Sequence, residues 1–186
     1  CIIDSDFNYK KINLPINQWI INELAYTKLQ IKNNISKYLF HEVANELYHF
    51  VWHTYCDWYL EFSKTLLTSD KEESKETKNV LIWVFGEILK ISHPIIPFVT
   101  EKLWSILFSK ENSLINEIYT KIEIQNSYEI SQENFKKLTL IISSIRNLRS
   151  ELNIPYKNQI KLNINNKDEN FCNFLKSSEI EIVRLL

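Results

Sequence analysis

Four side chains between residues 46 and 57 are of types that ligate metal ions. They recur every three or four residues and so share one face of a helix: Glu46, His49, His53 and Asp57. Glu46 and His49 form Glu-x-x-His, which is half of the ligand set of a di-metal helical bundle. The second half is missing, because neither His41 nor His93 follows a glutamate at that spacing. We therefore expect a polar helix face here and no structural or catalytic metal.

The same stretch, YHFVWHTYCDWYLEF over residues 48–62, is rich in aromatic rings. Exposed rings beside cations would stack on unpaired bases. No Lys or Arg occurs between Lys37 and Lys64, however, and the rings fall on two apolar helical stripes. Packing in the core is therefore the favoured interpretation, with Val51 and Trp58 expected at the centre of the molecule.

A third group of residues is basic. Residues 131–161 have a local charge of +4 in a chain of net charge −1, and their cations are Lys136, Lys137, Arg146, Arg149, Lys157 and Lys161. Arg146 and Arg149 lie three apart and share a helix face, and a guanidinium can bind a phosphate through two hydrogen bonds. A solvated helix face with internal ion pairs, for example to Glu151, explains the pattern equally well.

The elements that must position these residues are mostly helical. Apolar spacing predicts helices over about 17–35, 40–67, 77–92, 97–108 and 131–153. Asn17 and Ser131 are the expected N-caps of the first and last of these. On the last helix the expected inward residues are Phe135, Leu138, Ile142, Ile145 and Leu148. Residues 68–76, TSDKEESKE, are expected to form an exposed loop.

The chain changes character after Pro155. QIKLNI alternates polar and apolar residues, which predicts a strand. The expected organisation is a lead-in over residues 1–14, an all-α helical bundle over 15–154 and the truncated start of an α/β segment over 155–186.

Composition limits the class of protein. The chain has 186 residues, 45% of them hydrophobic and 24% charged, which is ordinary for a soluble domain. The one glycine, Gly86, excludes the phosphate-binding loops that need several. Three distant cysteines disfavour a disulfide framework and fit a reducing cytoplasm. The chain contains no Met, has no signal pattern at its start and no apolar run that could cross a membrane. We expect it to be a piece of a longer protein.

Three segments, in this order and spacing, resemble the anticodon-binding region of class I aminoacyl-tRNA synthetases: FHEVANELYHFVWHTYCDWYLEFSK, HPIIPFVTEKLW and IRNLRSELNIP. The resemblance covers about residues 15–165. Phe50–Trp52 and Tyr55–Tyr59 resemble the valyl members rather than the isoleucyl or leucyl ones, and those two remain the alternative within the family.

The resemblance implies a helical bundle that holds the anticodon stem-loop of the valine tRNA. We expect a cytoplasmic protein and a monomer. It implies no active site, because the family's His-Ile-Gly-His and Lys-Met-Ser-Lys-Ser motifs are both missing. No cofactor is expected in this piece. ATP and Mg²⁺ would belong to the catalytic domain of the same parent chain, which would also be a partner of the bundle.

The resemblance also suggests a role for the basic residues. We expect Arg146 and Arg149 to project from the bundle surface near Lys157 and Lys161 and to contact tRNA phosphates. Lys32 and Lys37, near the end of the first helix, are weaker candidates for contacts with the same tRNA strand. The competing hypotheses are a helical interaction module without a nucleic acid ligand and a metal-dependent bundle enzyme.

Overall fold

The computed structural model describes residues 3–68, 72–108, 112–155, 157–158 and 160–185. Its helices are α1 (Pro15–Ser36), α2 (Phe40–Tyr48), the π-helical η1 (His49–Leu60), α3 (Glu61–Leu67), α4 (Glu72–Ser92), α5 (Pro97–Leu107), the short 3₁₀ turns η2 (Leu114–Asn116) and η3 (Asn126–Tyr128), α6 (Glu129–Glu151), α7 (Glu169–Ser177) and α8 (Glu179–Leu185). No strand occurs among the described residues. The prediction of an all-α bundle is confirmed.

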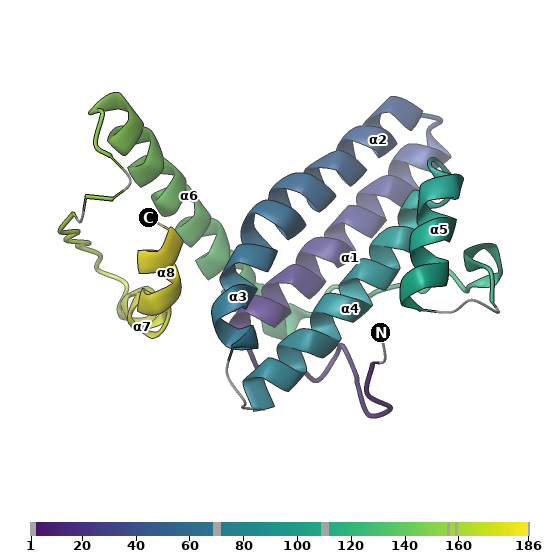
Figure 1. Cartoon of the computed structure of the whole chain (residues 1–186), viewed down its shortest axis with the longest axis horizontal. Helices are drawn as coiled ribbons and strands as arrows, with labels where there is room; N and C mark the ends of the chain where they lie inside the picture. Colours follow the sequence, from purple (N-terminus) through teal and green to yellow (C-terminus); the bar gives the residue numbers. More distant parts are fainter. Residues whose placement is uncertain (1–2, 69–71, 109–111, 156, 159, 186) are drawn as a thin grey trace.

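The bundle is built from helices that run up and down beside one another (Figure 1). α2, η1 and α3 form one continuous helix antiparallel to α1, α4 returns parallel to α1, and α5 turns back along α4. The first half of α6 packs on α1, and its second half leads away from the bundle. The most deeply buried apolar side chains include Ile20, Leu24, Tyr59, Phe62, Val84, Leu138 and Ile142.

A carboxylate from α4 holds the residues just before α1. Pro15 occupies the first turn, as its fixed φ favours. The Glu76 carboxylate accepts hydrogen bonds from the N–H groups of Asn13 and Leu14, both at 3.0 Å. Asn17 is therefore not the N-cap that the sequence suggested. It is fully buried, donates to Glu76 and accepts a 2.8 Å hydrogen bond from the Tyr59 hydroxyl.

The π-helical turn changes which aromatic residues face the core. Phe50, Tyr55 and Tyr59 are buried, and the step of five from Phe50 to Tyr55 follows the longer repeat of a π-helix. Val51 and Trp58 are only partly buried, so the prediction that they lie at the centre is wrong. An α-helical repeat drawn through residues 48–62 places Val51 and Trp58 too far inward because it assumes shorter steps.

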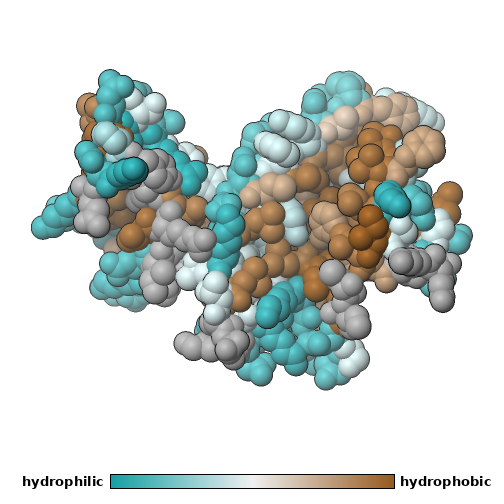
Figure 2. All heavy atoms as spheres, viewed as in Figure 1, coloured by the Kyte–Doolittle hydropathy of each residue, from teal (hydrophilic) through white to brown (hydrophobic). Residues whose placement is uncertain are grey.

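Two other local predictions are wrong and one is confirmed. α4 begins at Glu72, so most of the expected 68–76 loop is helix. The first turn of α4 is acidic, which suits the positive end of the helix dipole. Ser131 lies inside α6 and donates to Gln18 at 2.6 Å instead of capping the helix. α5 begins at Pro97 as expected, but Phe98 is 89% exposed, and Figure 2 shows apolar side chains gathered over α5.

The segment after Pro155 does not form the predicted α/β unit. The described residues 160–166 form neither a strand nor a helix. α7 and α8 follow, with the Asp168 carboxylate accepting from the N–H groups of Asn170 and Phe171 at the start of α7. On α6, Ile145 is half-buried and Leu148 exposed, so the expected inward stripe ends at Ile142.

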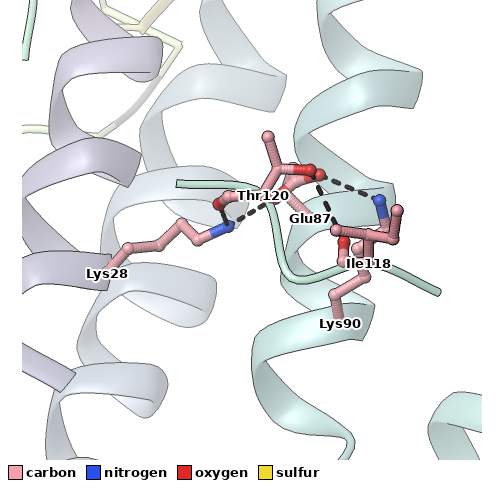
Figure 3. A network of polar contacts seen from close by, with 5 residues as sticks. All are labelled: Lys28, Glu87, Lys90, Ile118 and Thr120. Atoms are coloured by element: carbon pink, nitrogen blue, oxygen red, sulfur yellow. Dashed lines mark hydrogen bonds and ion pairs between the residues drawn. The ribbon is translucent and has the colours of Figure 1, made fainter. Parts of the chain in front are cut away.

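A buried ionic network fastens residues 117–125 to the bundle (Figure 3). Lys28 of α1 donates to Glu87 of α4 at 2.5 Å and to the Thr120 carbonyl at 2.6 Å. Lys90 reaches the other Glu87 oxygen at 3.2 Å. Burial lowers the pKa of Lys28, and the Glu87 carboxylate opposes that change. The network stabilises the arrangement of α1, α4 and the connecting segment.

Candidate nucleic-acid interface

Arg149 does not project from the surface. It lies in the last turn of α6 and is 7% exposed, with Nη2 donating to the carbonyls of Pro155 at 2.8 Å and Asn158 at 3.0 Å. The chain turns back on the helix at Asn153, whose φ is 52°. That reversal brings the following carbonyls onto the guanidinium, and the prediction of an outward side chain is wrong for this residue.

Arg146 is also engaged within the molecule. Its Nε and Nη2 donate to the Leu185 carbonyl at 3.0 and 2.7 Å. The guanidinium carbon lies 5.3 Å from the centre of the Trp58 ring, which is a cation–π geometry. Arg146 thus joins α6 to η1 and to the end of α8. It is half-buried rather than free on the surface.

Three of the predicted residues nevertheless line one groove: Arg149, Lys157 and Lys161. The groove has a volume of about 770 Å³ and lies between the 157–164 segment and α7–α8. Its other walls are mostly apolar, with Lys176 and Glu179 at its edge. Lys157 and Lys161 are exposed. Sequence reasoning missed Lys176 because its nearness to Lys161 arises only from the way α7 folds back.

Lys32 and Lys37 lie at the opposite end of the molecule, where α1 ends and α2 begins (Figure 1). Both are exposed, and neither takes part in an ion pair within the described residues. The structure therefore places five of the six predicted cations, all except Arg146, on two separate surfaces. We call them the groove surface (Arg149, Lys157, Lys161) and the turn surface (Lys32, Lys37).

The residues that resemble metal ligands form a polar face of the α2–η1 helix. The His53 Nδ1 lies 3.2 Å from an Asp57 oxygen, and the rings of His49 and His53 are 5.4 Å apart. Among the described residues, no group of three or more His, Cys, Asp or Glu side chains is arranged to hold a metal ion. In the same part of the chain no helix is long and apolar enough to span a bilayer.

Comparison with known proteins identifies the class to which the bundle belongs. The family model described as "Anticodon-binding domain of tRNA ligase" matches residues 17–164, most of the chain. The chain belongs to this family of tRNA ligase anticodon-binding domains.

The relatives point to one kind of ligase. A valine–tRNA ligase of Zymomonas mobilis is 35% identical over 189 residues, covering 100% of this chain and 21% of the relative. Valine–tRNA ligases of Lactobacillus acidophilus and Lactobacillus johnsonii are 36% and 39% identical, over 89% and 83% of this chain and 20% and 18% of the relatives. The chain thus spans about a fifth of the length of the curated relatives it matches.

Proposed function

We propose that this chain is the tRNA-binding module of a valine–tRNA ligase, and that it holds the anticodon stem-loop of the valine tRNA. It has no catalytic residues of its own in this proposal. Other parts of the parent enzyme, including its catalytic domain, attach valine with the help of ATP and Mg²⁺. The expected setting is the cytoplasm, and the expected state of the chain is a monomer.

The observation that carries the proposal is the groove surface. Lys157 and Lys161 stand exposed on a groove within the last part of the family match, and exposed cations bind the phosphates of a nucleic acid backbone. Arg149 has a supporting role here, since its hydrogen bonds to Pro155 and Asn158 hold the segment on which Lys157 lies. Arg149 is thus a positioning residue and the two lysines are the contacts.

The test is binding of the chain to a valine tRNA transcript at two salt concentrations. Lys157→Ala plus Lys161→Ala should weaken binding and reduce the salt slope by about two units, because each phosphate contact contributes about one. The matched control is Lys10→Ala plus Lys75→Ala, since these exposed lysines already pair with Glu123 and Asp4. If valine tRNA binds no better than a non-cognate tRNA, or if both double variants behave alike, the proposal fails.

A further inference from the structure

The end of α1 has an unusual residue in a left-handed conformation. The N–H of Leu39 donates to the Asn34 carbonyl at 2.9 Å and that of Tyr38 to the Ile35 carbonyl at 3.0 Å. This is a Schellman motif, whose central residue is usually Gly or Asn. Here it is Tyr38, with φ of 58°, a conformation that bulky side chains rarely adopt.

The end of α6 has the same motif, with a residue that suits the left-handed conformation. There the N–H of Ile154 donates to the Arg149 carbonyl at 2.9 Å, and Asn153 occupies the left-handed position. Asn tolerates this conformation because its short polar side chain bonds locally. The tyrosine at the α1 turn therefore carries a backbone cost that capping alone does not explain, and such outliers cluster at binding sites.

The Tyr38 ring is exposed to solvent and does not pack in the core. Tyr38 is 81% exposed and Phe40 is 62% exposed, and their rings meet edge to face with centroids 6.4 Å apart. With 81% of its surface exposed, Tyr38 keeps most of its ring accessible to a ligand. An exposed, pre-formed aromatic face is the feature on which an unpaired base stacks.

The surroundings of the pair favour an anionic ligand. The sequence has no Asp or Glu between Glu23 and Glu42. Lys32 and Lys37 are exposed on either side of the last turn of α1, and His41 follows Phe40. Glu42 lies 3.3 Å from the His41 Nε2 and is the first carboxylate along this stretch. Aromatic rings beside cations match the bases and phosphates of a single-stranded RNA segment better than an apolar protein surface.

We propose that Tyr38, supported by Phe40, stacks on an unpaired base of RNA while Lys32 and Lys37 bind the adjacent phosphates. This stacking site rests on the proposed function, since the RNA in question is the single-stranded loop that the family binds. It adds a second contact, at the end of the bundle opposite the groove surface. The tRNA would then contact the protein at both the groove surface and the turn surface.

The experiment uses this chain and an RNA hairpin with the stem and loop of a valine anticodon arm, in which 2-aminopurine replaces one loop base at a time. Tyr38→Gly removes the ring and relaxes the backbone, so it should raise the melting temperature by about 2–4 °C. It should also weaken hairpin binding by roughly 5- to 150-fold and abolish the stacking-induced change in 2-aminopurine fluorescence. Misfolding cannot explain a loss of binding in a variant that is more stable.

Two further variants separate stacking from other effects. Tyr38→Phe should keep the affinity and the fluorescence change, because a phenyl ring also stacks. Tyr26→Ala, which removes a partly exposed tyrosine from the middle of α1, should leave both unchanged. Wild-type affinity in Tyr38→Gly would overturn the stacking site while the proposed function stands. A shift of oligomeric state with unchanged RNA affinity would overturn it too, and would assign the pair to a protein contact. If the wild-type chain binds no hairpin, the proposed function fails and the stacking site fails with it.

Discussion

The last turns of α1 and α6 have the same backbone motif and opposite surroundings. At the end of α6 the turn residue is Asn153, and Arg149 donates to carbonyls of the returning chain. At the end of α1 the turn residue is Tyr38, and Lys32 and Lys37 remain exposed beside it. One turn uses its cation to hold the protein together, and the other leaves its cations available to a ligand.

The difference depends on where the chain goes after the turn. After α6 the chain stays close to the helix end, so its carbonyls need donors and the planar guanidinium bridges two of them. After α1 the chain enters α2 at once, and the carbonyls that follow are bonded within that helix. Within the described part of the chain, Lys32 and Lys37 form no ion pair. Residue type alone does not distinguish such a cation from one that is bound internally.

The largest expected effect comes from an inward cation of the bundle itself. Lys28→Ala should lower the free energy of unfolding by about 3–5 kcal/mol, because it leaves the Glu87 carboxylate buried without its closest partner. Side-chain exposures of 4% for Lys28 and 2% for Glu87 make water a poor substitute. Urea unfolding measures the loss. Lys32→Ala, on the same helix but exposed, should change stability by less than about 0.5 kcal/mol. Similar losses in the two variants would contradict the division into inward and outward cations.

Arg149 should have the next largest effect. Arg149→Ala should cost about 1–3 kcal/mol, since two backbone carbonyls lose their donor in a partly buried place. Arg149→Lys should recover only part of this, because an ammonium lacks the planar fork. Thermal unfolding of the three proteins gives the ranking. A fully stable Arg149→Ala protein would show that the guanidinium is not needed to hold the turn.

The contact of Arg146 with Trp58 should contribute less to stability than the hydrogen bonds of Arg149. A double-mutant cycle with Arg146→Ala and Trp58→Ala should give a coupling of about 0.5–1 kcal/mol, the usual size of a partly exposed cation–π contact. Trp58→Ala alone should cost less than Phe62→Ala, because Phe62 is fully buried and Trp58 only partly so. A coupling indistinguishable from zero would leave Arg146 held by the Leu185 carbonyl only.

The smallest effect concerns an inward carboxylate and depends on pH. Burial raises the pKa of Glu23 above its ordinary value of 4.5, and the hydrogen bond from Gln132 acts against this. The folded state therefore binds this proton more tightly than the unfolded state, and stability falls as pH rises above about 4.5. Glu23→Gln should melt at a higher temperature than wild type at pH 7, with the gap closing below about pH 4. Glu133→Gln, at an exposed site paired with Lys137, should show no such gain.

Much of the fold followed from apolar spacing and prolines. The predicted span of α1 and the start of α5 at Pro97 needed only local rules. The inner face of residues 48–62 could not be predicted in full, because the π-helical step from Phe50 to Tyr55 leaves no simple repeat in the sequence. Asn17 was mistaken for a cap because its real partners, Glu76 and Tyr59, lie far along the chain.

Residue type alone did not predict which of the cations point outward. Lys157 and Lys161 are exposed, as expected, and line a groove that the sequence did not predict, whereas Arg149 turns inward toward carbonyls that no sequence pattern marks. Tyr38 gave no signal, because a positive φ is a property of the folded turn. Assigning roles to cations therefore required the hydrogen bonds of the returning backbone.

The most direct test of this account compares the salt dependence of valine tRNA binding for an outward and an inward set of cations. Lys32→Ala plus Lys37→Ala should flatten the slope by about two units with little change in melting temperature. Arg146→Ala should lower the melting temperature and keep the wild-type slope, because its guanidinium is bound to Leu185 and Trp58. A flattened slope in Arg146→Ala at unchanged stability, with a wild-type slope in the lysine variant, would contradict it.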